Sequence, residues 1–125
     1  MEQTNKFVSF GKNILHYCGH YDWSFNFIKD SSEGYCWCSS KILDIGLKGT
    51  DINIKSLILH EISHIGTARF CNNKHNRSFW VKRLNLGYKF LKNYFPEWEL
   101  LLYNLYFKTG FYSIDYLSES ATPRF

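Results

Sequence analysis

The sequence predicts one α+β domain in which helices flank a small β-sheet. Apolar residues recur every three to four positions near the N-terminus and again after residue 51, as on one face of a helix. Between residues 22 and 45, short aromatic and β-branched runs are separated by turn-forming residues, which is typical of strands. The 125 residues, 45% of them hydrophobic, suffice for one core and are too few for two ordinary domains. We therefore expect a single domain over residues 1–125.

The first predicted element is a helix over residues 5–17. Phe7, Phe10 and Ile14 lie three to four positions apart and form an apolar stripe. Gly19 follows this stripe, and glycine commonly ends a helix.

Three short strands are predicted next, over residues 23–28, 35–38 and 41–45. The first alternates apolar and polar residues, and the turn formers of residues 30–34 separate it from the second. Because these segments follow one another closely, we expect a small antiparallel sheet of three strands.

The next helix is predicted from isoleucines that recur at intervals of four, four and three residues up to Ile65. Asp51 is its expected N-cap. A second long helix is expected over residues 77–94. Pro96 suits the first turn of a further helix over residues 97–108. Gly110 is the expected stop of this helix, and a short strand is expected at 111–114.

The N-terminal residues lack a basic segment followed by an apolar one, and no stretch approaches the roughly 18 apolar residues of a membrane span. We therefore expect a cytoplasmic protein that does not contact membranes. Its cysteines match no paired CxxC zinc spacing, so buried thiols are expected, with a disulfide or a metal role as the alternative. These residues are Cys18, Cys36, Cys38 and Cys71.

Positive charge is concentrated in one part of the chain. The formal net charge is only +4, but between Ile62 and Pro96 there are seven basic residues and no acidic one. This basic segment, from Arg69 to Lys92, is either a solvated helix face or a surface that contacts nucleic acid.

The segment His60-Glu61-Ile62-Ser63-His64 is an HExxH motif on a predicted helix. Positions i and i+4 lie about 40° apart on a helix, one turn along the axis, so both imidazoles can bind one tetrahedral zinc ion. Glu61 lies beside that face, where it can accept a proton from a water molecule on the metal. Leu57, Leu59 and other apolar neighbours favour burial of the opposite side of the helix.

A catalytic zinc site needs a third protein ligand. His75 lies eleven residues after His64, within reach of the first helix, whereas the nearest later carboxylate is Glu97, on a different predicted helix. We therefore favour His75, with a carboxylate as the alternative. His16 and His20 are also four residues apart, but Gly19 makes helical geometry there doubtful and no glutamate follows His16, so surface or core roles are expected for them.

The chain resembles the SprT-like zinc metallopeptidases and related small metallopeptidase-like proteins of bacteriophages and bacteria. The resemblance covers residues 23–86. It joins a Trp-x-Phe strand, a Gly-x-Cys strand, an Ile-x-Leu type strand, the HExxH helix and a histidine followed four residues later by an aromatic residue. The matching positions are Trp23-Ser24-Phe25, Gly34-Tyr35-Cys36, Ile42-Leu43-Asp44-Ile45, His60-Glu61-Ile62-Ser63-His64 and His75-Asn76-Arg77-Ser78-Phe79-Trp80.

The resemblance implies a minimal zincin-like domain in which His60, His64 and His75 bind one zinc ion and Glu61 is the general base. Two features depart from the family. Asn76 stands where SprT proteins usually have glycine, and the frequent C-terminal zinc ribbon of four cysteines is missing.

The predicted function is therefore a zinc-dependent peptidase that acts on a protein or peptide, including proteins associated with nucleic acid. One alternative is a non-catalytic zinc-containing module that binds nucleic acid or protein through the basic segment. The other is a regulator resembling ImmA proteases, which cleave a repressor.

Overall fold

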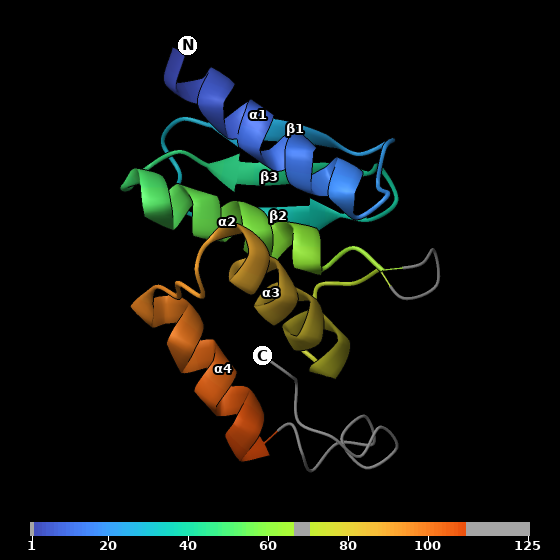
Figure 1. The fold of residues 1–125 in the computed structure, drawn as a ribbon, viewed down its shortest axis with the longest axis vertical. Coiled ribbons are helices and arrows are strands. Elements are labelled where there is room, and N and C mark those ends of the chain that lie inside the picture. Colours follow the sequence, from blue (N-terminus) through green and yellow to red (C-terminus); the bar gives the residue numbers. More distant parts are fainter. Residues whose placement is uncertain (1, 67–70, 110–125) are drawn as a thin grey trace. The chain divides into compact units, whose positions relative to one another are not determined.

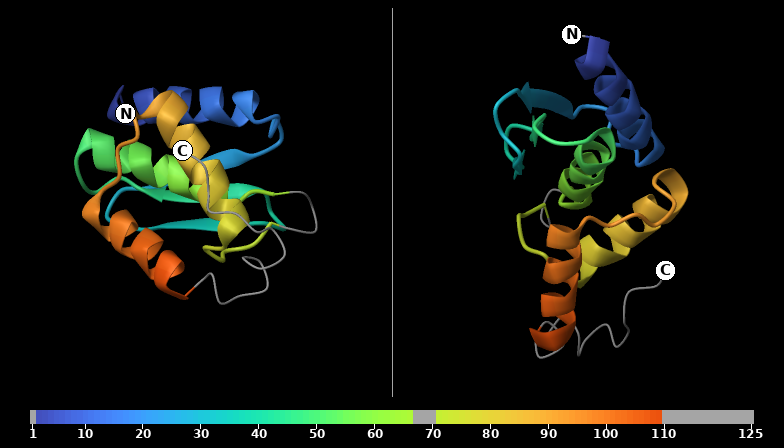
Figure 2. Two further views of the ribbon diagram at one scale, coloured as in Figure 1. Left: turned by 60° about the horizontal axis from the view of Figure 1, so that its bottom comes forward. Right: turned by 90° about the vertical axis from the view of Figure 1, so that its left-hand side faces the viewer.

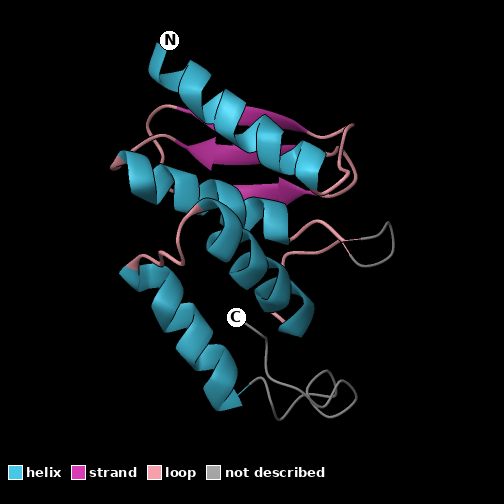
Figure 3. Ribbon diagram, viewed as in Figure 1, coloured by secondary structure: helices cyan, strands magenta, loops and turns pink. Residues whose placement is uncertain are grey.

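The computed structural model describes residues 2–66 and 71–109. Within them, four helices and one three-stranded sheet form an α+β fold, as predicted (Figures 1 and 3). The expected Gly110 stop and strand at 111–114 lie outside the described residues. The chain divides into two compact units, Met1–Asn73 and Lys74–Phe125. The elements are α1 (Glu2–Tyr17), β1 (Ser24–Ile28), β2 (Gly34–Trp37), β3 (Ile42–Gly46), α2 (Asp51–Ser63), α3 (Arg77–Phe90) and α4 (Glu97–Thr109).

The sheet of the first unit is mixed, so the expectation of a purely antiparallel sheet was wrong. The strand order is β1-β3-β2, and β3 pairs in parallel with β1 and antiparallel with β2. The last strand in sequence thus lies between the other two. Alternation of apolar and polar residues predicts which face of a strand is buried, but it does not select the neighbouring strand.

Helices α1 and α2 cover the same face of this sheet (Figures 1 and 2). Phe7 and Ile14 of α1, Leu43 and Ile45 of β3, and Ile58 of α2 are all fully buried in this core. The helix α1 approaches β1 closely at Gly11, where an added Cβ would lie 2.4 Å from the ring of Phe25. A side chain at this position would therefore push the helix or the ring away.

The helix α2 and its N-cap begin one residue earlier than predicted. Thr50, and not Asp51, is the N-cap, with an extended backbone and a hydroxyl that accepts from the N–H of Asn53. Asp51 is the first helical residue, and its negative charge interacts favourably with the positive N-terminal end of the helix dipole. No helix in the described part of the chain is long and apolar enough to cross a bilayer.

The second unit contains α3, α4 and an aromatic core of its own. Phe79, Trp80 and Tyr106 are buried together, and Phe95 and Tyr103 pack against them. The helix α3 ends at Phe90, four residues before the predicted end at Tyr94. Lys92 and Asn93 have positive φ angles of 50° and 64°, and this left-handed backbone cannot continue a right-handed helix.

Arg83, a residue of the basic segment, is not at the surface. Arg83 is fully buried and forms a two-pronged ion pair with the fully buried Glu99, with N···O distances of 2.7 and 2.9 Å. The same guanidinium donates to the carbonyl of Tyr94 at 2.9 Å and lies 4.2 Å from the ring centroid of Phe95. Arg83 therefore joins α3 to α4 and contributes no surface charge.

Candidate metal centre

The last turns of α2 carry the HExxH motif in a buried setting. His60, Glu61 and His64 are only 4%, 4% and 5% exposed. The two imidazole rings meet edge to face, with centroids 5.2 Å apart and planes at 74°. His64 is the C-cap of the helix and keeps a right-handed helical backbone, so the i, i+4 spacing is preserved to its last residue.

Glu61 lies directly against the edge strand β2. A Cβ built on Gly34, the first residue of this strand, would lie 2.8 Å from Glu61 Oε2 and 2.9 Å from Glu61 Cγ. The same Cβ would lie 2.9 Å from the carbonyl oxygen of Asp44 in β3. Only glycine leaves this space, so Gly34 is a residue of the site. It was matched in the Gly-x-Cys pattern of the sequence, but its contact with Glu61 depends on the packing of α2 on the sheet.

This arrangement suits a metal ion with nitrogen ligands. Two imidazoles bound to one tetrahedral zinc ion have ring centroids about 5 Å apart, and the rings of His60 and His64 are spaced accordingly. Ser63 is not a candidate nucleophile, because its hydroxyl donates to the carbonyl of Leu59 at 2.7 Å within the helix. His60 and His64 are thus candidate metal ligands, with a carboxylate between them in sequence.

His75, the predicted third ligand, lies in the second unit and is also a candidate ligand. It immediately precedes Asn76, the N-cap of α3, whose Oδ1 accepts from the N–H of Phe79 at 3.1 Å. The ring of Phe79 meets the His75 ring edge to face at 4.9 Å. The cap and this ring contact orient His75 within its own unit, and its role as a ligand belongs to the proposal below.

The second histidine pair has a different geometry. His16 is in the last turn of α1, whereas His20 lies beyond the helix, after Gly19 with a φ of +80°. The ring of His16 packs edge to face on Tyr21, with centroids 5.3 Å apart. As expected, the two histidines do not lie on one helix.

The expectation of thiols is wrong for two of the four cysteines and holds for the other two. Cys38 and Cys71 form a disulfide across 33 positions of the sequence, while Cys18 and Cys36 are outside it. Cys36 lies in β2, and Cys38 directly follows the end of this strand at Trp37. The approach of Cys71 depends on how the chain returns to β2 after α2, and nothing in the sequence indicated it. Cys36, Cys38 and Cys71 form a further group of candidate metal ligands.

The chemistry of this centre is therefore that of a buried pair of nitrogen ligands with an adjacent carboxylate held against an edge strand. Such a donor set can bind a transition metal and move a proton beside it. Comparisons with protein-family models, curated proteins and solved structures found no match to this chain.

Proposed function

We propose that this protein is a zinc-dependent peptidase in which His60, His64 and His75 bind one zinc ion and Glu61 transfers the proton. The observation that carries the proposal is the buried HExxH turn, with the Glu61 carboxylate held over Gly34 of the edge strand. The resemblance to SprT-like metallopeptidases supports the same assignment.

Each residue of the proposed site has a separate task. When bound, zinc supplies a Lewis acid that lowers the pKa of water from about 16 to about 7 and polarises a carbonyl group. His60 and His64 of α2 would hold the ion, and His75 would provide the third nitrogen ligand of a catalytic zinc site. Glu61 takes the proton from the attacking water and passes it to the leaving amine.

The burial of Glu61 supports this role. A carboxylate removed from bulk water interacts more strongly with nearby charge and acts on water molecules held within the site. The contact with Gly34 limits the positions open to the side chain on one side, so the carboxylate is held in place before substrate arrives.

The test compares the full-length wild type with Glu61→Gln. Both proteins are expected to bind about one zinc ion per chain by elemental analysis, because glutamine leaves the three histidines unchanged. Cleavage of an unstructured protein such as casein should fall about 10²- to 10⁴-fold in Glu61→Gln, the usual contribution of a general base. Equal activity of the two proteins would refute the assigned role of Glu61.

The chain offers a matched control for the ligands in its other histidine pair. His60→Ala is expected to lose zinc, whereas His16→Ala, which changes an imidazole in the last turn of α1, should retain it. If both variants retain zinc, the proposed metal site is refuted. If Glu61→Gln and wild type both lack turnover but bind DNA in a salt-dependent way, the non-catalytic binding module is favoured instead.

A further inference from the structure

A second cluster of potential ligands lies in the first unit, apart from the HExxH residues. Cys36 is a fully buried residue of β2, and its Sγ lies 4.0 Å from Sγ of Cys38 and 3.9 Å from Sγ of Cys71. The latter two residues form the disulfide. Three sulfur atoms from two distant parts of the chain thus lie within 4.8 Å of one another.

The spacing around Cys36 suits a metal ion with sulfur ligands. Two thiolates on one tetrahedral zinc ion, each with a bond of about 2.3 Å, are about 3.8 Å apart. Both distances from Cys36 are close to this value. Thiolates are preferred ligands of zinc and other soft or borderline ions, so the same three side chains can bind metal once all three carry thiols.

The cluster does not depend on the disulfide alone to hold its parts together. Asn73, two residues after Cys71, donates from its side-chain nitrogen to the backbone carbonyl of Cys36 at 3.0 Å. This bond attaches the segment that carries Cys71 to β2 without involving sulfur. It favours the approach of Cys71 to Cys36 independently of the disulfide.

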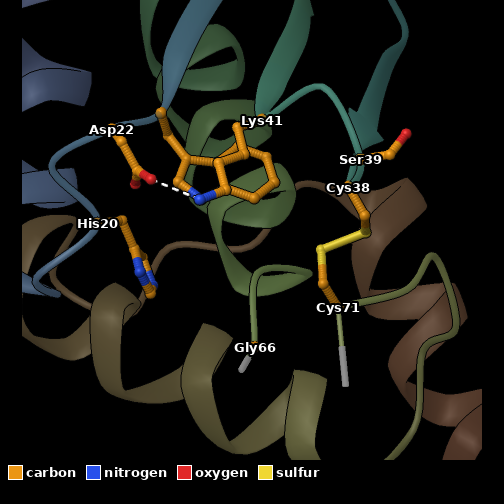
Figure 4. Close-up of a pocket in the computed structure, with 8 residues that line it drawn as sticks. His20, Asp22, Cys38, Ser39, Lys41, Gly66 and Cys71 are labelled. Carbon is orange, nitrogen blue, oxygen red and sulfur yellow. Dashed lines mark hydrogen bonds and ion pairs between the residues drawn. A yellow bond between two sulfur atoms is a disulfide. The ribbon is translucent and has the colours of Figure 1, made fainter. Parts of the chain in front are cut away.

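The disulfide is also accessible. Cys38 and Cys71 line a hollow of about 490 Å³ within the first unit, together with His20, Asp22 and Gly66 among others. In Figure 4 the two sulfur atoms lie on one side of this hollow, opposite His20 and Asp22. A reductant and a metal ion can reach the sulfur atoms from this side, and a water molecule can occupy the fourth position of a tetrahedral ion.

We propose that Cys36, Cys38 and Cys71 form a second metal site, which binds one zinc ion through three thiolates when the disulfide is reduced. A phosphine reductant and one water molecule convert the disulfide into two thiols, and the phosphine becomes its oxide. Metal binding then releases the three thiol protons to solvent. The disulfide and the metal need the same two sulfur atoms, so each excludes the other. This inference is independent of the proposed peptidase activity.

Cobalt(II) is the probe, because thiolate ligands give it an intense near-ultraviolet charge-transfer band that histidine ligands do not give. The full-length protein is reduced with a phosphine, desalted without oxygen and titrated with cobalt(II). The band should saturate at one equivalent in the thiolate site and should be absent before reduction. Absence of this band from the reduced wild type would overturn the proposal.

Variants separate the two metal sites. Cys36→Ser should weaken the cobalt affinity of the thiolate site tenfold or more, whereas Cys18→Ser, which changes the cysteine outside the cluster, should titrate like the wild type. The double variant His60→Ala/His64→Ala should keep the charge-transfer band, so failure of the histidine site leaves this result unaffected. Equal titrations of Cys36→Ser and Cys18→Ser would contradict a three-thiolate site. If Cys36→Ser does not fold, the comparison of reduced and oxidised wild type still decides the outcome.

Discussion

Substitution of Gly34 by alanine tests the packing on which the candidate metal centre depends. The new methyl carbon would lie 2.8 and 2.9 Å from two atoms of Glu61 and 2.9 Å from the Asp44 carbonyl oxygen. All three distances are several tenths of an ångström too short, so the side chain of Glu61 or the backbone of the sheet must move. Overpacking of this kind costs about 1–3 kcal/mol of unfolding free energy, which leaves an ordinary domain folded.

The cause of this cost is tested by a double-mutant cycle. In a Glu61→Ala background, two of the three close contacts disappear and only the Asp44 carbonyl remains. Gly34→Ala should therefore cost less there, with a coupling energy of about 0.5–2 kcal/mol. Urea unfolding, followed by circular dichroism, measures the unfolding free energy of all four proteins of the cycle. An equal slope of this free energy against urea concentration shows that the proteins undergo the same unfolding transition.

Gly11→Ala is the matched control for this cycle. It also forces a methyl group against a side chain, because an added Cβ would lie 2.4 Å from the ring of Phe25. Gly11 is far from Glu61 in sequence and lies in α1, whereas Glu61 lies in α2. Gly11→Ala should lower the unfolding free energy by the same amount in the wild-type and Glu61→Ala backgrounds. Equal costs of Gly34→Ala in the two backgrounds would refute the position assigned to the Glu61 carboxylate.

Two further predictions concern the second unit. Arg83→Met should lower the unfolding free energy by about 3–5 kcal/mol, because it leaves the buried Glu99 without its cation, whereas Arg83→Met/Glu99→Leu should return it near or above the wild-type value. Chemical denaturation measures the unfolding free energy of both variants. Lys89→Met is the exposed control, and its unfolding free energy should lie within about 0.5 kcal/mol of the wild type. An Arg83→Met protein as stable as this control would contradict the buried pair. Asn76→Ala should cost about 1 kcal/mol and Asn76→Gly only a few tenths, since glycine is also a good N-cap. Equal costs of these two substitutions would argue against the capping bond.

The N-cap role of Asn76 gives a physical account of one departure from the SprT-like pattern. Asparagine and glycine are both favoured at this position of a helix, and alanine is not. Asn76 can therefore start α3 as a glycine at this position could, and His75 lies directly before the helix.

The repeat of apolar residues predicted α1, α2, α3 and α4 to within a few residues, because a helix face is set by local spacing. The helix α3 starts at Arg77 as predicted, but its C-terminal end was less predictable. The positive φ angles of Lys92 and Asn93 end the helical region early, although neither residue is a glycine or proline. The three strands were found for the same local reason, but their order and direction were not.

By itself, the sequence determined the α+β class, the elements and the i, i+4 spacing of His60 and His64, since all of these depend on residues near one another in the chain. Contacts between distant residues required the tertiary structure. These include the parallel pairing of β3 with β1, the glycine beneath Glu61, the disulfide between Cys38 and Cys71, and the burial of Arg83 against Glu99. Each arises from packing of segments that are far apart in sequence, and no local pattern of residue types specifies which segments meet.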